Sequence, residues 1–337
     1  MFNPLPTACG RRLLLLLCLG GLALTTAPAL AAKRPYVETE PKRGFHLFTR
    51  PKKKSPADQW QYVQTLDAAG KSRAAARQAY ALRLYWPQSP EAPQAQLLQA
   101  RILEHRGRSI EAFDAYQHLV ETWPGHFEFN DVLTRQMTLA RAIMERRKGK
   151  FLFLPGFTAP ERAIPYFEKI AQSAPESDLT AEAFYHIGAA HERTYEYVQA
   201  IDAYFTTLNR FPGSPFAEPA AFGQARCHVR LAAEAPEDNR AVETAIAACD
   251  LYLQRHPAGP NAQQVRDDQA GLRRRQAANA FARARYYDRI LRKPEAALIE
   301  YQAFLNSFPN ADEAPKARRR VQELTRNAPP APPENAP

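Results

Sequence analysis

Histidine and cysteine are the side chains of this 337-residue chain with the chemistry to bind a transition metal. His186 and His191 are five positions apart, whereas two metal ligands on one helical face need a spacing of four. Cys227 and His228 are adjacent, but no second pair of this kind lies near them in the sequence. These spacings predict no metal site.

Motifs for nucleophilic catalysis and phosphate binding are missing from the sequence. It contains no Gly-x-Ser-x-Gly elbow and no Gly-x-x-x-x-Gly-Lys-Ser/Thr loop. The chain has only 14 Gly against 29 Pro, and glycine-poor chains rarely build phosphate-binding turns. We therefore expect no cofactor and a protein that is not an enzyme.

The first 31 residues have the pattern of an export signal. Arg11 and Arg12 precede an apolar run over residues 13–24, and Ala29-Leu30-Ala31 forms a small-residue cleavage site. This pattern predicts a mature chain that begins at Ala32 in the periplasm. The alternative is lipidation at Cys18, but the residue before it is the bulky Leu17, and lipoprotein signals need a small residue there.

Three runs of basic residues accompany the formal net charge of +10. They are Lys52-Lys53-Lys54, Arg273-Arg274-Arg275 and Arg318-Arg319-Arg320. Inside a cell such runs would suggest nucleic acid, but export makes that partner improbable, and we expect none. Anionic lipid headgroups or an acidic partner protein are the expected partners of the first run. The other two are interpreted as solvated helix faces.

An internal repeat organises the rest of the chain, because an Ala is followed twelve positions later by a Pro six times. The pairs are Ala75/Pro87, Ala112/Pro124, Ala163/Pro175, Ala200/Pro212, Ala245/Pro257 and Ala297/Pro309. Mostly bulky residues recur four and seven positions after the Ala, which is the spacing of one helical face. The Pro marks the end of that helix.

A second helix precedes each of these. Phe184, Ile187, Gly188 and His191 line such a helix in the fourth copy, so we interpret His191 as a packed residue. Small residues at Gly188 and Ala200 would let the two helices approach closely. The pattern resembles the tetratricopeptide repeat and predicts an all-α solenoid of stacked helical hairpins.

These patterns divide the chain into segments. We expect a signal peptide at 1–31, a basic Pro-rich flexible arm at 32–56, about six hairpins at 57–326 with an insertion at 148–157, and a disordered Pro-rich tail at 327–337. Thr158 and Glu161 suggest a capping box after the insertion. Pro165 predicts a kinked helix, and the wide last spacing predicts a long helix over residues 262–289.

The last repeat carries a more specific resemblance. Its segments Arg283-Ala284-Arg285-Tyr286-Tyr287, Ala296-Ala297-Leu298-Ile299-Glu300-Tyr301 and Phe308-Pro309-Asn310-Ala311 resemble those of the BamD family of outer-membrane β-barrel assembly factors. The resemblance implies a periplasmic scaffold associated with the outer membrane. Its implied partners are the barrel-assembly subunit and unfolded outer-membrane proteins. The alternative is an adaptor of other envelope or peptidoglycan machinery.

Tetratricopeptide proteins bind extended peptides along the concave face formed by their first helices. The positions that this geometry selects are Trp60, Gln64, Leu97, Arg101, Tyr185 and Glu192. For Leu97 and Tyr185, packing between repeats is an equal alternative. In the insertion, Phe151 and Phe153 are expected either to contact a partner or to pack on the third repeat, because exposed apolar area costs ~25 cal/mol per Å².

The two cysteines of the mature chain, Cys227 and Cys249, lie on the two helices of the fifth hairpin. Each is eleven residues from Asp238, near the turn, so the antiparallel helices bring them to similar height. In an oxidising compartment such a pair tends to form a disulfide if the geometry allows it. Two small buried apolar residues are an equal alternative.

Overall fold

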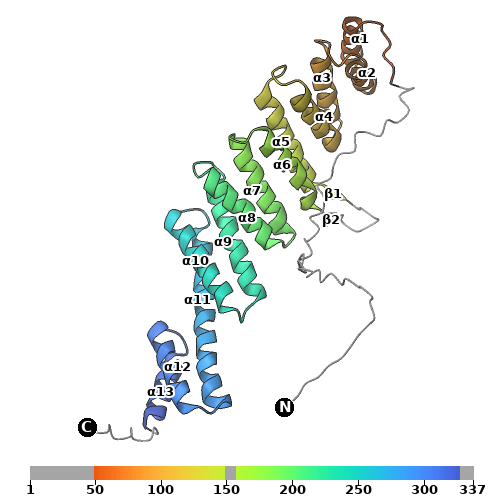
Figure 1. Ribbon diagram of the computed structural model, residues 1–337. Helices are drawn as coiled ribbons and strands as arrows, with labels where there is room; N and C mark the ends of the chain where they lie inside the picture. The colour runs from red at the N-terminus through yellow and green to blue at the C-terminus, as the bar shows by residue number, and fades with distance from the viewer. Residues whose placement is uncertain (1–48, 149–156, 327–337) are drawn as a thin grey trace, which may run out of the picture. The chain divides into compact units, whose positions relative to one another are not determined.

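The computed structural model describes residues 49–148 and 157–326, and within these ranges almost all of the chain is helical (Figure 1). The elements are α1 (Pro56–Ala68), α2 (Ser72–Tyr85), α3 (Ala92–His105), α4 (Ser109–Thr122), α5 (Phe129–Glu145), β1 (Arg147–Lys148), β2 (Phe157–Thr158), η2 (Pro160–Ala163), α6 (Ile164–Ser173), α7 (Asp178–Arg193), α8 (Tyr197–Arg210), α9 (Ala217–Glu234), α10 (Asn239–Arg255), α11 (Ala262–Arg285), η3 (Tyr286–Ile290), α12 (Pro294–Ser307) and α13 (Ala314–Arg326).

Successive helices pack against each other as antiparallel hairpins, from α1–α2 to α11–α12, with α13 after the last. The fold is the all-α tetratricopeptide-type solenoid that the repeat predicts. All six signature alanines are fully buried, and five of them lie in second helices. The sixth, Ala163, ends the 3₁₀ turn η2 that leads into α6. A methyl side chain at this position allows the helices of a hairpin to approach closely.

The predicted helix ends are also confirmed. Trp86, Trp123, Phe211 and Phe308 are the C-caps of α2, α4, α8 and α12, each directly before its Pro. The backbone N–H of each C-cap still donates to the carbonyl four residues earlier. Pro cannot make that bond, so the helix ends there. The Trp123 indole also donates to the Pro87 carbonyl at 3.1 Å, which joins two neighbouring repeats.

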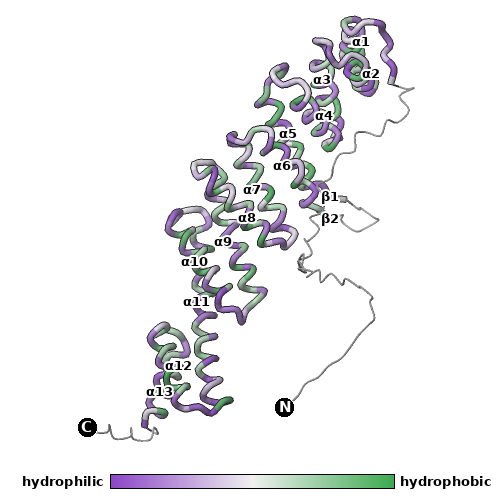
Figure 2. Tube along the Cα trace, in the orientation of Figure 1, coloured by the Kyte–Doolittle hydropathy of each residue, from purple (hydrophilic) through white to green (hydrophobic). Residues whose placement is uncertain are grey.

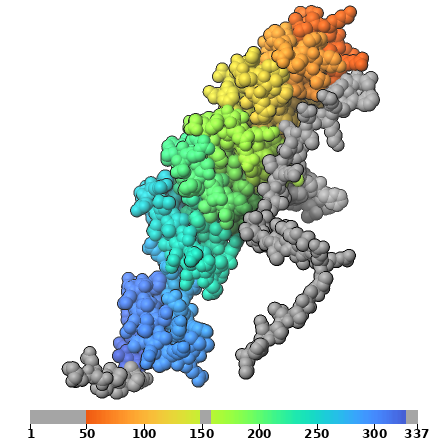
Figure 3. All heavy atoms as spheres, viewed as in Figure 1, coloured from red at the N-terminus to blue at the C-terminus, as the bar shows by residue number. Residues whose placement is uncertain are grey.

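The buried side chains form several clusters along the stack. The largest joins α1 to α8, another joins α9, α10 and the first half of α11, and a third joins the second half of α11 to α12 and α13. In Figure 3 the side chains of successive hairpins are in contact along the stack. The long α11, predicted over 262–289, therefore belongs to two clusters, and it continues into the π-helical turn η3.

The insertion differs from expectation at its C-terminal side. Its flanks pair as a short antiparallel ribbon, with Arg147 opposite Thr158. Thr158 is thus in a strand, and η2 has Ala159 as its N-cap with no side-chain hydrogen bond, so the predicted capping box is wrong. Pro165 lies in the first turn of α6, where a missing N–H costs no helical bond, so the predicted kink inside a helix is also wrong.

The last residues of the predicted basic arm are bonded to the first helix. Ser55 caps α1 by accepting from the Asp58 N–H, and the N–H groups of Lys52 and Lys53 both donate to Gln59 Oε1 at 3.0 Å. Gln59 is fully buried, so these bonds attach residues 52–55 to the helical stack. Several predicted features lie outside the described residues: the signal peptide, the part of the arm before residue 49, Phe151 and Phe153 of the insertion, and the tail.

Among the helices of residues 49–148 and 157–326, none combines the length and the apolar character that a membrane crossing requires.

Candidate protein-binding face

The residues predicted to line a peptide groove lie on the first helices of three hairpins. On α1, Trp60 is half-buried against the largest cluster and Gln64 is exposed. On α3, Leu97 is also half-buried against that cluster, so packing accounts for it. Arg101, one turn further along α3, is exposed and its Nη2 lies 3.7 Å from Asp131 Oδ2 on α5.

Tyr185 and Glu192 lie on α7. Tyr185 is half-buried, with its ring centroid 5.5 Å from that of Phe216 and 6.0 Å from that of Tyr204, so it packs between repeats. Glu192 is mostly buried and paired with Arg226 of α9. The structure therefore places the six predicted residues on three helices and gives Glu192 an internal partner.

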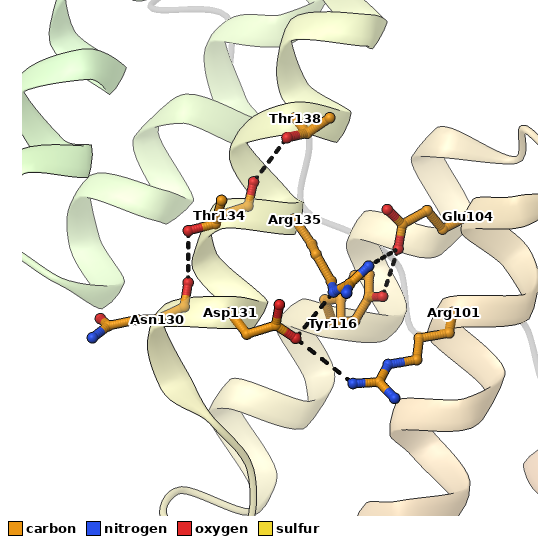
Figure 4. Close-up of polar contacts among 8 residues, drawn as sticks. All are labelled: Arg101, Glu104, Tyr116, Asn130, Asp131, Thr134, Arg135 and Thr138. Carbon is orange, nitrogen blue, oxygen red and sulfur yellow. Dashed lines mark hydrogen bonds and ion pairs between the residues drawn. The ribbon is translucent and has the colours of Figure 1, made fainter.

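A cluster of polar side chains joins α3, α4 and α5 (Figure 4). The Tyr116 hydroxyl donates to Glu104 Oε2 at 2.7 Å, and Arg135 Nη1 reaches the same oxygen at 3.4 Å. Arg135 Nε also donates to Asp131 Oδ2 at 3.0 Å. Burial, with help from the Glu104 carboxylate, raises the pKa of Tyr116, so its hydroxyl remains a hydrogen-bond donor.

The same arrangement recurs at α7, α8 and α9. The Tyr204 hydroxyl donates to Glu192 Oε2 at 2.8 Å, and Arg226 Nη2 donates to that oxygen at 2.7 Å. Burial and Glu192 raise the pKa of Tyr204. Hydrogen bonding to Glu192 raises the pKa of Arg226, so the pair is charged. Both oxygens of the Glu192 carboxylate therefore accept hydrogen bonds from within the protein.

A third copy joins η3, α12 and α13. Arg320 binds Asp288 in a bidentate manner, at 2.7 Å through Nη2 and 2.9 Å through Nε. The Tyr301 hydroxyl lies 3.4 Å from Asp288 Oδ2. Hydrogen bonding to Arg320 holds the pKa of the buried Asp288 below its usual value. We call these three groups the acid–tyrosine–arginine clusters.

The clusters have a sequence signal that the repeat analysis missed. Tyr116, Tyr204 and Tyr301 all stand four residues after a signature Ala, in a slot assigned only to packing. The acid precedes the Tyr by 12, 12 and 13 residues, and the Arg follows the acid by 31, 34 and 32. Repeats with Phe167 or Cys249 in this slot lack the hydroxyl.

Ion pairs also connect the first helices of successive hairpins. Arg101 pairs with Asp131 between α3 and α5, Arg141 with Glu182 at 3.3 Å between α5 and α7, and Glu192 with Arg226 between α7 and α9. Next to them on α5, the exposed Thr134 and Thr138 hydroxyls donate to carbonyls one turn earlier (Figure 4). Arg101 and Arg141 are exposed members of these pairs, whereas Glu182 and Glu192 are mostly buried.

His186 and His191, the two histidines considered for a metal site, each contact other side chains of the protein. His186 stacks on Phe167 with centroids 5.2 Å apart, and its Nε2 lies 3.5 Å from Glu182 Oε1. His191 is half-buried, with its Nδ1 2.7 Å from Glu196 Oε2 across the α7–α8 turn. In the part of the chain that the structure describes, no three residues among His, Cys, Asp and Glu come together as a metal site.

Cys227 and Cys249 are both buried as free thiols, so the structure does not contain the predicted bridge. Cys227 packs with Tyr197 and Tyr204 of α8, whereas Cys249 packs in the cluster of α9, α10 and α11 with Val242 and Leu272. The helix α9 lies between α8 and α10, and Cys227 is on the side that faces α8. Similar height along two helices therefore does not bring the sulfur atoms together.

Comparison with known proteins gives one curated relative. No family model matches the chain. Over 188 residues the chain is 24% identical to the outer membrane protein assembly factor BamD of Caulobacter vibrioides, and the aligned stretch covers 54% of this chain and 61% of that protein. The chain thus matches less than two thirds of that relative's length.

Solved structures of tetratricopeptide proteins are similar at low identity. The C-terminal part of a repeat protein from Cytophaga hutchinsonii has 18% identity and a TM-score of 0.35, with 79% of this chain and 88% of that chain covered. A tetratricopeptide repeat protein from Parabacteroides merdae has 15% identity and a TM-score of 0.30, with 81% and 99% covered.

Proposed function

We propose that this chain is a non-catalytic scaffold that binds proteins during the assembly of outer-membrane β-barrel proteins, on the periplasmic side of the outer membrane. The observation that carries the proposal is the 24% identity with an outer membrane protein assembly factor. The predicted export signal supports the location, and the stack of helical hairpins is an architecture suited to protein binding.

In this proposal the binding face comprises the exposed first-helix side chains of α1 and α3, with their neighbours on α5. Arg101 is its test residue, because its side chain is 46% exposed and its partner Asp131 also binds Arg135. Losing Arg101 therefore leaves the internal cluster intact. The partners would be the barrel-assembly subunit and unfolded outer-membrane proteins, with the basic arm near anionic lipid.

The test is capture of the purified barrel-inserting subunit by the intact chain and by the Arg101→Glu variant. We expect the intact chain to retain the subunit and Arg101→Glu to weaken retention, because the new carboxylate lies beside Asp131 and reverses the local charge. Arg108→Glu is the matched control, since Arg108 is 49% exposed and paired with Glu111 at the α3–α4 turn. Failure of the intact chain to retain the subunit would refute the proposal.

The insertion is a second proposed contact, and it is tested separately. Four large apolar side chains at residues 151–154 are costly to leave in water. In the double variant Phe151→Ser/Phe153→Ser, we expect an unchanged helical circular dichroism spectrum and reduced capture of the subunit. Loss of folding would mean that both side chains belong to the core. Normal folding with normal capture would show that the insertion is not a contact.

A further inference from the structure

The turn between α11 and α12 exposes an unusual group of apolar side chains. Tyr286 is 50% exposed, Ile290 68% and Leu291 40%. They belong to the π-helical turn η3 and the residue after it, and π-helical turns are often found at functional sites. Figure 2 shows hydrophobic colour at this end of α11, next to strongly hydrophilic chain. We call Tyr286, Ile290 and Leu291 the apolar tip.

Internal contacts of the same turn hold these side chains outwards. Asp288 is buried by its bidentate bond to Arg320, and Tyr287 packs against the cluster of α12 and α13. The N–H groups of Leu291 and Lys293 donate at 3.0 Å to the carbonyls of Tyr286 and Tyr287. The third acid–tyrosine–arginine cluster therefore anchors the inner side of the turn. Its outer side is left to solvent.

Four cations lie next to the apolar tip in the sequence. Arg285, Arg289, Arg292 and Lys293 are all exposed. Arg289 lies 3.5 Å from Asp288, which Arg320 already neutralises, and the other three make no ion pair with the described residues. Arg292 has φ 52°, a left-handed conformation that is uncommon outside glycine. The tip thus presents aromatic and aliphatic side chains in a short segment that also carries four exposed cations.

We propose that the apolar tip docks onto an anionic phospholipid bilayer, with Tyr286, Ile290 and Leu291 at the headgroup–acyl boundary and the four cations on the phosphates. Tyrosine and isoleucine suit that boundary, and arginine and lysine extend their charged ends to the headgroups. A stable protein interface buries ~800 Å² on each partner, far more than three such side chains supply. A bilayer needs only shallow insertion plus charge attraction.

The proposal is independent of the barrel-assembly function and of the basic arm, so its test uses variants within the tip. The chain from Ala32, which keeps every described residue, is sedimented with vesicles of phosphatidylglycerol and phosphatidylcholine, or of phosphatidylcholine alone. Ile290→Ser removes the most exposed apolar side chain of the tip. Arg292→Gly/Lys293→Gln removes two charges, and the glycine relieves the left-handed backbone.

We expect binding only to the vesicles with phosphatidylglycerol. Ile290→Ser should weaken it roughly tenfold, and the charge variant roughly thirtyfold. The matched controls are Ile299→Ser, 65% exposed with the acidic Glu295 one turn before it, and Arg73→Gln/Arg77→Gln, two exposed cations on α2. Both should bind like the unchanged chain. Unaltered binding by the tip variants, or no binding by the unchanged chain, would overturn the proposal.

Discussion

Three tyrosine hydroxyls determine how neighbouring hairpins are connected. Each stands in a slot that other repeats fill with a residue lacking the phenol, and each reaches an acid that also binds an arginine of a later helix. A buried hydroxyl needs such a partner, and a charged acceptor makes a stronger bond than a neutral one. One residue type at one slot thus links helices from two consecutive repeats.

The Tyr204 hydroxyl is expected to stabilise the fold measurably. Tyr204→Phe keeps the ring but removes the bond to Glu192, and should lower the free energy of unfolding by about 1.5–3 kcal/mol. Urea unfolding followed by circular dichroism measures this. Tyr85→Phe is the control, because Tyr85 is 45% exposed and its hydroxyl bonds to none of the described residues. Equal effects of the two substitutions would show that the Tyr204 hydroxyl contributes nothing specific.

The two thiols of the chain from Ala32 should be unreactive in the folded protein. Burial raises the pKa of both Cys227 and Cys249 to about 12, and thiol reagents attack the thiolate. At pH 8 we expect no rapid reaction in the native state. After unfolding without reductant, two thiols should react. A finding of none would mean that the purified protein carries the bridge that the structure lacks.

Close approach of α7, α8 and α9 depends on two glycines that face one ring. A Cβ at Gly188 would lie 2.7 Å from Tyr204 Cδ1, and a Cβ at Gly223 would lie 2.5 Å from its Cζ. Both distances are shorter than van der Waals contact allows. The expectation that Gly188 permits close approach is confirmed, and Gly223 does the same from the next repeat.

Two glycine-to-alanine changes in helices should therefore have opposite effects. Gly223→Ala should destabilise the protein by about 1–3 kcal/mol, because the methyl group meets the Tyr204 ring. Gly271→Ala in α11 should stabilise it by about 0.5–1 kcal/mol, because nothing lies within 4 Å and alanine favours the helix. Thermal unfolding of both variants tests this. Stabilisation by Gly223→Ala would mean that α9 moves away from the ring at little cost.

At the scale of the whole described chain, stability should vary along the stack. Solenoid repeats contact only their neighbours, so each region depends on its own cluster and on the interfaces beside it. The cluster of α12 and α13 is separate from the larger one at α1–α8, and α11 lies between them. We expect α12 and α13 to open without unfolding the rest.

Phe304→Ala tests this local opening. Phe304 is 2% exposed, and replacing a buried Phe by Ala costs about 3–5 kcal/mol. Hydrogen exchange should become faster in α12 and α13 and remain slow in α3 to α8. Phe167→Ala, in the largest cluster, is the counterpart and should accelerate exchange around α6 instead. Uniform acceleration along the chain by Phe304→Ala would contradict independent clusters.

The sequence by itself determined the helical hairpins and where the second helices end. The Ala at each close contact, the bulky residues four and seven positions later and the terminating Pro all act within one or two helical turns, so a linear pattern reveals them. It also placed Arg101 and Glu192 on first helices. Local signals misled where a neighbouring element competed, as with Thr158, which pairs in a strand, and Pro165, which begins a helix.

Only the tertiary structure decided which side chains meet across helices. Glu192, which the sequence suggested for peptide binding, is the partner of Tyr204 and Arg226. Cys227 and Cys249 pack in different clusters. The tertiary structure also shows that Ile290 is exposed, within a segment that is rich in arginine. Such contacts join residues tens of positions apart, and they depend on how each helix is rotated against the next. Packing of the whole stack sets that rotation, and no local spacing records it.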